Sequence, residues 1–165
     1  MAETLFIPQT ENRAEIYEAL GLQMEALLSQ EKDLIANLAN FVAVLKEAFG
    51  FFWIGFYWVK GNELVLAPFQ GTLACTRIGY GKGVCGTVWK EERTILVPDV
   101  EAFPGHIACS SLSKSEIVVP VFQGGKVVAV LDIDSDKLND FSETDQKGLE
   151  NLVKILEKHL PSMQK

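Results

Sequence analysis

Apolar residues recur every three or four positions at both ends of the chain, which is the period of an amphipathic helix. This pattern predicts helices over residues 11–29 and 34–49. A third long helix is expected over 142–159, where Ser142 and Asp145 have the spacing of an N-terminal capping box. Both ends of the chain are therefore expected to be helical.

The middle of the chain is different, because its apolar residues fall in short extended runs separated by turns. Aromatic and β-branched residues dominate these runs, which favours strands. Two consecutive glycines between the last two runs indicate a hairpin. The expected strands cover residues 51–59, 64–68, 94–97, 116–122 and 126–133, with a short helix over 84–92.

This order of elements predicts an α+β fold, because hairpins dominate and no alternation of strands with crossover helices is visible. We expect a single domain over residues 1–165, with an antiparallel sheet and the N- and C-terminal helices on one of its faces. Two long loops, 70–83 and 98–109, interrupt the extended part. Loops of about a dozen residues are uncommon in compact domains and are often functional.

The three cysteines lie in or next to these loops. Cys75 falls in the first loop, Cys109 ends the second, and Cys85 is expected in the first turn of the short helix. Their number is odd and no C-x-x-C pair is present, so neither a structural disulfide framework nor a structural zinc site is indicated. Each can be a small buried apolar residue, but their loop positions make them candidates for thiol chemistry.

Two of the cysteines have neighbours that can activate a thiol. A helix N-terminus and a nearby cation lower a thiol pKa, so Cys85, which follows Lys82, is the thiol that local electrostatics favours. His106 lies three residues before Cys109, and a Cys/His pair is another route to a thiolate. The alternative for His106 is a loop histidine bonded to the backbone.

Three acidic residues fall at the ends of two paired strands. Asp132 and Asp134 alternate along one strand and so point to the same face. A strict two-residue turn would place Glu116 opposite Ile133, on the wrong face to join them. We expect a bulge, supplied by Pro120 or the glycine pair, to bring Glu116 to the two aspartates. The alternative is that these acids simply face solvent.

Four of the six aromatic residues in the predicted strand over residues 51–59 alternate between its faces. Trp53 and Tyr57 share one face, and Phe56 and Trp58 share the other. One of these faces is expected to be core, as is usual for aromatic stripes.

The net charge of −7 argues against nucleic-acid and anionic-membrane partners, since both are recognised by basic residues. The first residues lack the basic and long apolar parts of a signal peptide. No apolar run approaches the roughly 20 residues that span a bilayer. A cytoplasmic protein is expected.

Five motifs, in their order along the chain, resemble those of the free methionine-(R)-sulfoxide reductases. The motifs are Ala74-Cys75-Thr76-Arg77-Ile78, Gly81-Lys82-Gly83-Val84-Cys85-Gly86, Gly105-His106-Ile107-Ala108-Cys109, Ser115-Glu116-Ile117-Val118-Val119-Pro120 and Leu131-Asp132-Ile133-Asp134-Ser135. This family consists of single-domain GAF-fold enzymes, so the resemblance implies that fold, with the long active-site loops on the sheet face opposite the helices.

The resemblance implies a role for each cysteine. Cys109 would attack the sulfoxide and become a sulfenic acid, and Cys75 would resolve it as an intramolecular disulfide that thioredoxin reduces. Cys85 would be an accessory or alternative resolving thiol. The resemblance also implies a homodimer, a role in oxidative stress, and turnover with no bound cofactor or metal.

The substrate, free L-methionine (R)-sulfoxide, would be held by residues from the strands. Glu116, Asp132 and Asp134 would line its pocket, and Trp53 with Tyr57 would enclose its methionine end. Two alternatives are weighed against this interpretation. One is a non-enzymatic GAF sensor of a small ligand or of redox state, and the less favoured one is a metal site built from the cysteines, His106 and the acids.

Overall fold

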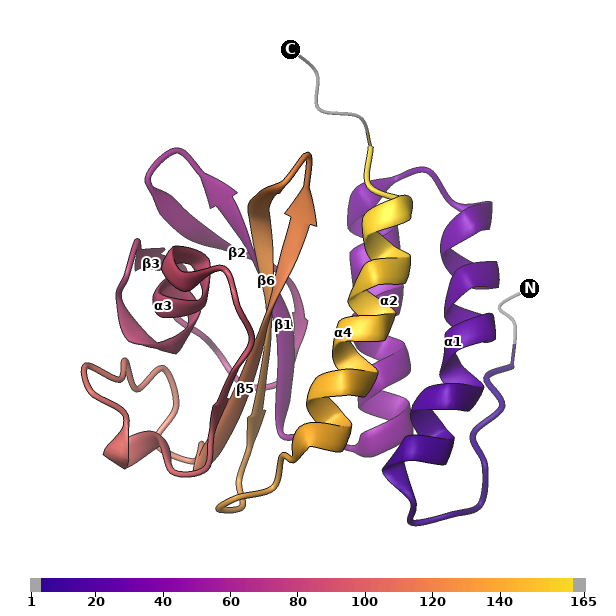
Figure 1. The fold of residues 1–165 in the computed structure, drawn as a ribbon, viewed down its shortest axis with the longest axis horizontal. Helices are drawn as coiled ribbons and strands as arrows, with labels where there is room; N and C mark the ends of the chain where they lie inside the picture. The colour runs from indigo at the N-terminus through magenta and orange to yellow at the C-terminus, as the bar shows by residue number, and fades with distance from the viewer. Residues whose placement is uncertain (1–3, 162–165) are drawn as a thin grey trace.

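A six-stranded antiparallel sheet forms the middle of the molecule, and three helices cover one of its faces (Figure 1). The computed structural model describes residues 4–161. The covering helices are α1 (Arg13–Gln30), α2 (Leu34–Phe49) and α4 (Glu143–Lys158). Across the sheet the strands follow the order β3 (Arg77–Gly79), β2 (Glu63–Gln70), β1 (Trp53–Lys60), β6 (Lys126–Ser135), β5 (Ser115–Gln123) and β4 (Ile95–Val97).

The opposite face of the sheet carries α3 (Gly83–Glu91), a short 3-10 turn η1 (Val100–Ala102) and the loops around them (Figure 1). The α+β prediction is confirmed, and so is the placement of helices and long loops on opposite faces. The strand β3 was missed, because three residues at the edge of the sheet are too few to show a period of two.

The sheet is buried on both faces, and alternation along β1 shows how. Phe56 belongs to the core between the sheet and the helices, whereas Trp53 and Tyr57 belong to a second buried cluster under α3. The expected division of these aromatic residues between the two faces is confirmed. Such double burial allows a sheet face to hold a site that is largely shielded from water.

Asp145 joins the first and last helices of the covering layer. Its carboxylate accepts hydrogen bonds from the Tyr17 hydroxyl (2.9 Å), the Arg13 guanidinium (3.1 Å) and the backbone N–H of Ser142 (2.9 Å). The last of these completes the expected capping box of α4. A Cβ at Gly148 would lie 2.3 Å from the Tyr17 ring, so the two helices approach closely only because this position is glycine.

The hairpin of β5 and β6 contains the expected bulge. Phe122 lies opposite Val127, but Val121 lies opposite Ala129, so Val128 is an additional residue on β6. The irregularity is in neither of the two places that were expected, since the pairing beside the glycine turn is regular and Pro120 pairs normally. No helix between residues 4 and 161 combines the length and the apolar character needed to cross a membrane.

We expect Asp145→Ala to lower the free energy of unfolding by about 3 kcal/mol, because it leaves the Tyr17 hydroxyl and the backbone N–H of Ser142 without their acceptor and removes one of the two carboxylates that pair with Arg13. Urea denaturation measures the change. Glu143→Ala, an exposed acid in the same helical turn, is the control and should cost less than about 1 kcal/mol. Equal losses in the two variants would contradict the role of Asp145.

Candidate active site

The bulge in β6 sets the register that brings three acids together. Glu116 on β5 lies opposite Asp134 on β6 rather than opposite Ile133, and Asp134 in turn lies opposite Trp53 on β1. These three side chains therefore form one row across the sheet. Asp132 lies two residues along β6 on the same face. The expected convergence of the acids is confirmed in the geometry.

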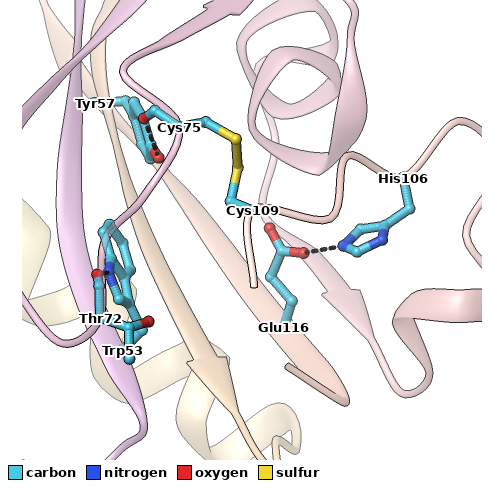
Figure 2. The surroundings of a disulfide bond; sticks show 7 residues. All are labelled: Trp53, Tyr57, Thr72, Cys75, His106, Cys109 and Glu116. Carbon is cyan, nitrogen blue, oxygen red and sulfur yellow. Dashed lines mark hydrogen bonds and ion pairs between the residues drawn. A yellow bond between two sulfur atoms is a disulfide. The ribbon is translucent and has the colours of Figure 1, made fainter. Parts of the chain in front are cut away.

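Trp53 can lie flat over this face because two of the positions that pack against its ring are glycines. A Cβ at Gly55 would lie 2.4 Å from the Trp53 ring, and one at Gly71 would lie 2.3 Å from it. The indole N–H donates to the carbonyl of Thr72 at 3.0 Å (Figure 2). Trp53 therefore attaches the loop after β2 to the sheet.

A disulfide joins Cys75 to Cys109, with their Cα atoms 5.3 Å apart (Figure 2). The bond links the loop after β2 with the loop between η1 and β5. The Tyr57 hydroxyl donates to the carbonyl of Cys75 at 2.9 Å, so the sheet also fixes the backbone of one bridged cysteine. Both cysteines are half-buried, and Cys109 lines the same pocket as the acids and Trp53.

The pocket is a small cavity of about 40 Å³ between the sheet, α3 and the two bridged loops. About 10–15 Å³ of such space holds one water molecule, so this cavity holds only a few. Its polar lining consists chiefly of the acids together with Cys85, His106 and Lys82. With the disulfide formed, the site is therefore narrow.

Glu116 and Asp132 are buried and Asp134 is half-buried, and loss of contact with water is the largest cause that raises the pKa of each. The pKa of Asp132 rises to about 6. The pKa values of Glu116 and Asp134 rise well above the usual range, with repulsion from Asp132 adding to the effect. Acids so close together do not all ionise at neutral pH. The cluster therefore holds protons that it can give to a bound molecule.

One carboxylate oxygen of this cluster lacks a partner. Oδ1 of Asp132 is buried and accepts no hydrogen bond from any group within residues 4–161. A buried acceptor in this state costs free energy, so a ligand that brings an N–H or O–H donor to it gains that free energy on binding.

The prediction that Cys85 is a low-pKa thiol is wrong. The residue does lie in the first turn of α3, but its side chain is buried and hydrogen-bonds with Asp132. Burial first, and then the charges of Asp132 and Glu116, raise the pKa of the Cys85 thiol well above its usual value. The helix terminus is outweighed because the sequence does not reveal that the thiol points into an acidic cluster.

His106 faces the acids. Its Nε2 lies 3.8 Å from Oε2 of Glu116 (Figure 2), and burial lowers its pKa. It shares a loop with Cys109, as its sequence position requires, but the group that its ring approaches is the Glu116 carboxyl. The pairing of His106 with Cys109 and its alternative, a hydrogen bond from the His106 ring to the backbone, are both different from this arrangement.

The N-terminal end of α3 also lines the pocket, which sequence reasoning missed. Lys82 is its N-cap residue and offers no side-chain cap, so the backbone N–H groups of the first turn are not used by a cap. A helix N-terminus attracts anions. The sequence does contain a signal for such an anion site, because the glycine-rich segment Gly81-Lys82-Gly83 directly precedes a short helix.

Three side chains of the pocket lie close enough together to hold a divalent cation. Cys85 Sγ and carboxylate oxygens of Glu116 and Asp132 all lie within 4.8 Å of one another. Hydrogen bonds from Cys85 and Glu116 to Asp132 use protons that a bound cation would displace.

The fold and this site define the class of protein. The family model described as "GAF domain" matches residues 30–157, and the chain belongs to that family. Within it, the chain belongs with the free methionine-R-sulfoxide reductases, a family of oxidoreductases that act on sulfur.

Three comparisons carry this assignment. The chain is 60% identical over 158 residues to GAF domain-containing protein A of Dictyostelium discoideum, covering 95% of this chain and 99% of that one. It is 43% identical over 150 residues to the free methionine-R-sulfoxide reductase of Escherichia coli, covering 90% and 91%. The X-ray structure of free methionine-R-sulfoxide reductase from Neisseria meningitidis in complex with its substrate matches with 54% identity, a TM-score of 0.93 and coverage of 96% and 95%.

We expect Glu116→Gln to gain stability relative to the wild type as pH rises from 4 to 8. A buried carboxyl with a raised pKa stays protonated in the folded chain while the unfolded chain ionises it, so the wild type loses stability above the ordinary carboxyl pKa of about 4. Gln has no such loss. Urea denaturation at both pH values measures the difference.

Glu101→Gln is the control for this measurement, because the Glu101 side chain is exposed in the folded chain. Its difference from the wild type should not grow with pH. A Glu116→Gln difference that stays constant or shrinks would contradict the raised pKa.

Proposed function

We propose that this protein reduces free L-methionine (R)-sulfoxide to L-methionine, with Cys109 as the nucleophile. The observation that carries the proposal is the Cys75–Cys109 disulfide beside a buried cluster of partly protonated acids. Sulfoxide reduction requires these two parts, a thiol that attacks sulfur and an acid that protonates the departing oxygen. Relatives named for this activity support the choice of substrate.

The reaction begins with attack of the Cys109 thiolate on the sulfoxide sulfur. An acid of the cluster protonates the oxygen, which transfers to Cys109 as a sulfenic acid while methionine leaves. The Cys75 thiolate then attacks the Cys109 sulfur, releases water and forms the disulfide. Two electrons pass from the two thiols to the sulfoxide, and no bound cofactor or metal takes part.

The polar groups of the pocket match the two charged ends of a free amino acid. An ammonium group can donate to the buried Oδ1 of Asp132, and the acids supply its countercharge. The uncapped N-terminus of α3 and Lys82 suit a carboxylate. A methionine sulfoxide within a peptide chain has neither charge, so this pocket favours the free form.

Trp53 and Tyr57 have two roles in this proposal. Their rings stack 6.1 Å apart on the sheet face of the pocket, where they can enclose the apolar methylthio end of the substrate. Their polar atoms hold the loop that carries Cys75. They therefore connect substrate binding with the position of the resolving thiol.

Cys85 is an accessory or alternative resolving thiol in this proposal. Its raised pKa leaves little thiolate at neutral pH, so it is a weaker nucleophile than a thiol in an open loop. Its hydrogen bond with Asp132 places it within the acid cluster, where it influences the proton held there.

The bridged loops must separate during each cycle, because a cavity of about 40 Å³ is too small for methionine sulfoxide. Reduction of the disulfide removes the covalent link between them. We assign this reduction to thioredoxin, which returns both cysteines to thiols. Turnover with cytosolic thioredoxin implies a cytoplasmic protein that acts in oxidative stress, and the homodimer that the family resemblance implies is part of this proposal.

Substitution of the two bridged cysteines separates their roles. We expect Cys109→Ser to lose at least roughly 10³-fold in turnover, because it removes the attacking atom. Cys75→Ser should still release one methionine per protein molecule in a single turnover and then slow, because its sulfenic acid is not resolved. The assay is NADPH oxidation coupled through thioredoxin reductase and thioredoxin, with methionine release followed by chromatography.

Ser111→Ala, on the same loop as Cys109, is the control and should keep wild-type turnover. Full activity of Cys109→Ser would remove Cys109 as the nucleophile. Binding of methionine sulfoxide by the wild type without any turnover would favour a GAF sensor instead.

We expect N-acetylmethionine (R)-sulfoxide to be a poor substrate, with kcat/KM lower than that of free methionine (R)-sulfoxide by at least roughly 10²-fold. Acetylation removes the ammonium group and leaves the buried carboxylates unpaired. Steady-state kinetics in the same coupled assay measures both substrates. Equal values of kcat/KM would show that the acids do not recognise the ammonium group.

A further inference from the structure

The two segments that carry the bridged cysteines contain no acidic residue, lysine or arginine and are partly apolar. The six residues 71–76 and the eight residues 106–113, together called the disulfide rim, include no Asp, Glu, Lys or Arg, although these make up 22% of the chain. Within the rim, the side chains of Leu73, Leu112 and Ile107 are 90%, 56% and 38% exposed. Three of the eight large apolar side chains that are exposed within residues 4–161 thus lie on these two short segments.

Single exposed leucines are common on protein surfaces and need no explanation. These three differ because the disulfide holds their segments together. Leu73 and Ile107 each lie two residues before a bridged cysteine, and the Cα atoms of the two cysteines are 5.3 Å apart. Leu112 follows three residues after Cys109. The apolar side chains therefore surround the bond that has to be opened.

We propose that the disulfide rim is the docking surface of a protein dithiol reductant. The reductant would have an apolar, weakly charged surface around its reactive thiol, and this surface would pack on Leu73, Ile107 and Leu112. The inference rests on the proposed function in one respect, that the Cys75–Cys109 bond forms in each cycle. A thiolate must come within bonding distance of a sulfur in line with the bond, so a protein reductant must cover the rim. A small thiol reaches the half-buried bond without contacting these side chains.

The exchange balances within the two partners. A thiolate of the reductant attacks one sulfur of the Cys75–Cys109 bond, forms a mixed disulfide and releases the other cysteine as a thiolate. The second thiol of the reductant then attacks the mixed disulfide and releases the first cysteine. Two electrons move to this chain, and the reductant leaves as a disulfide.

The test compares a protein reductant with a small one on the oxidised protein, in the absence of methionine sulfoxide. The variant is the double substitution Leu73→Ser with Leu112→Ser, which changes exposed side chains. The second-order rate of disulfide reduction by reduced thioredoxin and by dithiothreitol is measured by acid quenching and thiol counting. We expect the rate with thioredoxin to fall about tenfold or more, as for loss of apolar anchors from an interface, and the rate with dithiothreitol to stay within about twofold.

Ile35→Ser is the matched control, because Ile35 is 67% exposed and lies on α2, in the layer on the other side of the sheet. It should leave both rates unchanged. An unchanged rate with thioredoxin in the double variant would overturn the proposal, and so would an equal fall with both reductants. Because no sulfoxide is present, a failure of this test is distinct from a failure of the proposed reductase activity, which the turnover assay reports.

Discussion

The close placement of three carboxyl groups on one covered face of the sheet, two of them buried and one half-buried, is the constraint on which the rest of the site depends. Ionised acids this close would repel one another in a shielded environment, so the cluster persists by keeping protons. That requirement explains why the face is covered by α3 and two long loops. It also explains the thiol of Cys85, which hydrogen-bonds with Asp132 as a neutral partner. Placing these acids away from water lowers the stability of the fold. The helical layer on the other face of the sheet, in which Asp145 joins α1 to α4, offsets this loss.

The two bridged loops form the adjustable part of the molecule. Their attachment to the sheet is local, through Trp53 to Thr72 and through Tyr57 to the backbone of Cys75. The loop that carries Cys109 is tied across the pocket by the disulfide itself. Opening that bond therefore frees the Cys109 loop more than the Cys75 loop. In the proposed cycle the nucleophile moves with substrate entry, while the resolving thiol stays close to its position over the sheet.

The sequence was sufficient for the features that have a period or a motif. The helices, the hairpins and the faces of β1 follow from apolar spacing, and the need for Glu116 to join the aspartates was enough to predict a bulge. The position of the bulge at Val128 was not predictable, because that residue lies in a continuous apolar run with no glycine or proline beside it. The pKa of Cys85 was mispredicted for a related reason. A helix terminus is visible in a sequence, but the burial that outweighs it depends on how α3 lies against the acids of another element.

The sheet explains why acid and thiol chemistry meet in one small pocket. Strands β1, β5 and β6 place Trp53, Glu116 and Asp134 in one row, fixed by backbone pairing. The thiols cannot be fixed in the same way, because each sulfur has to change its bonding partner during thiol–disulfide exchange. The chain therefore keeps its proton donors on paired strands and its bridged sulfurs on loops. The same division predicts where change is tolerated: the loops can alter their outer side chains to suit a reductant, whereas a one-residue shift in β6 would turn the acids away from the pocket.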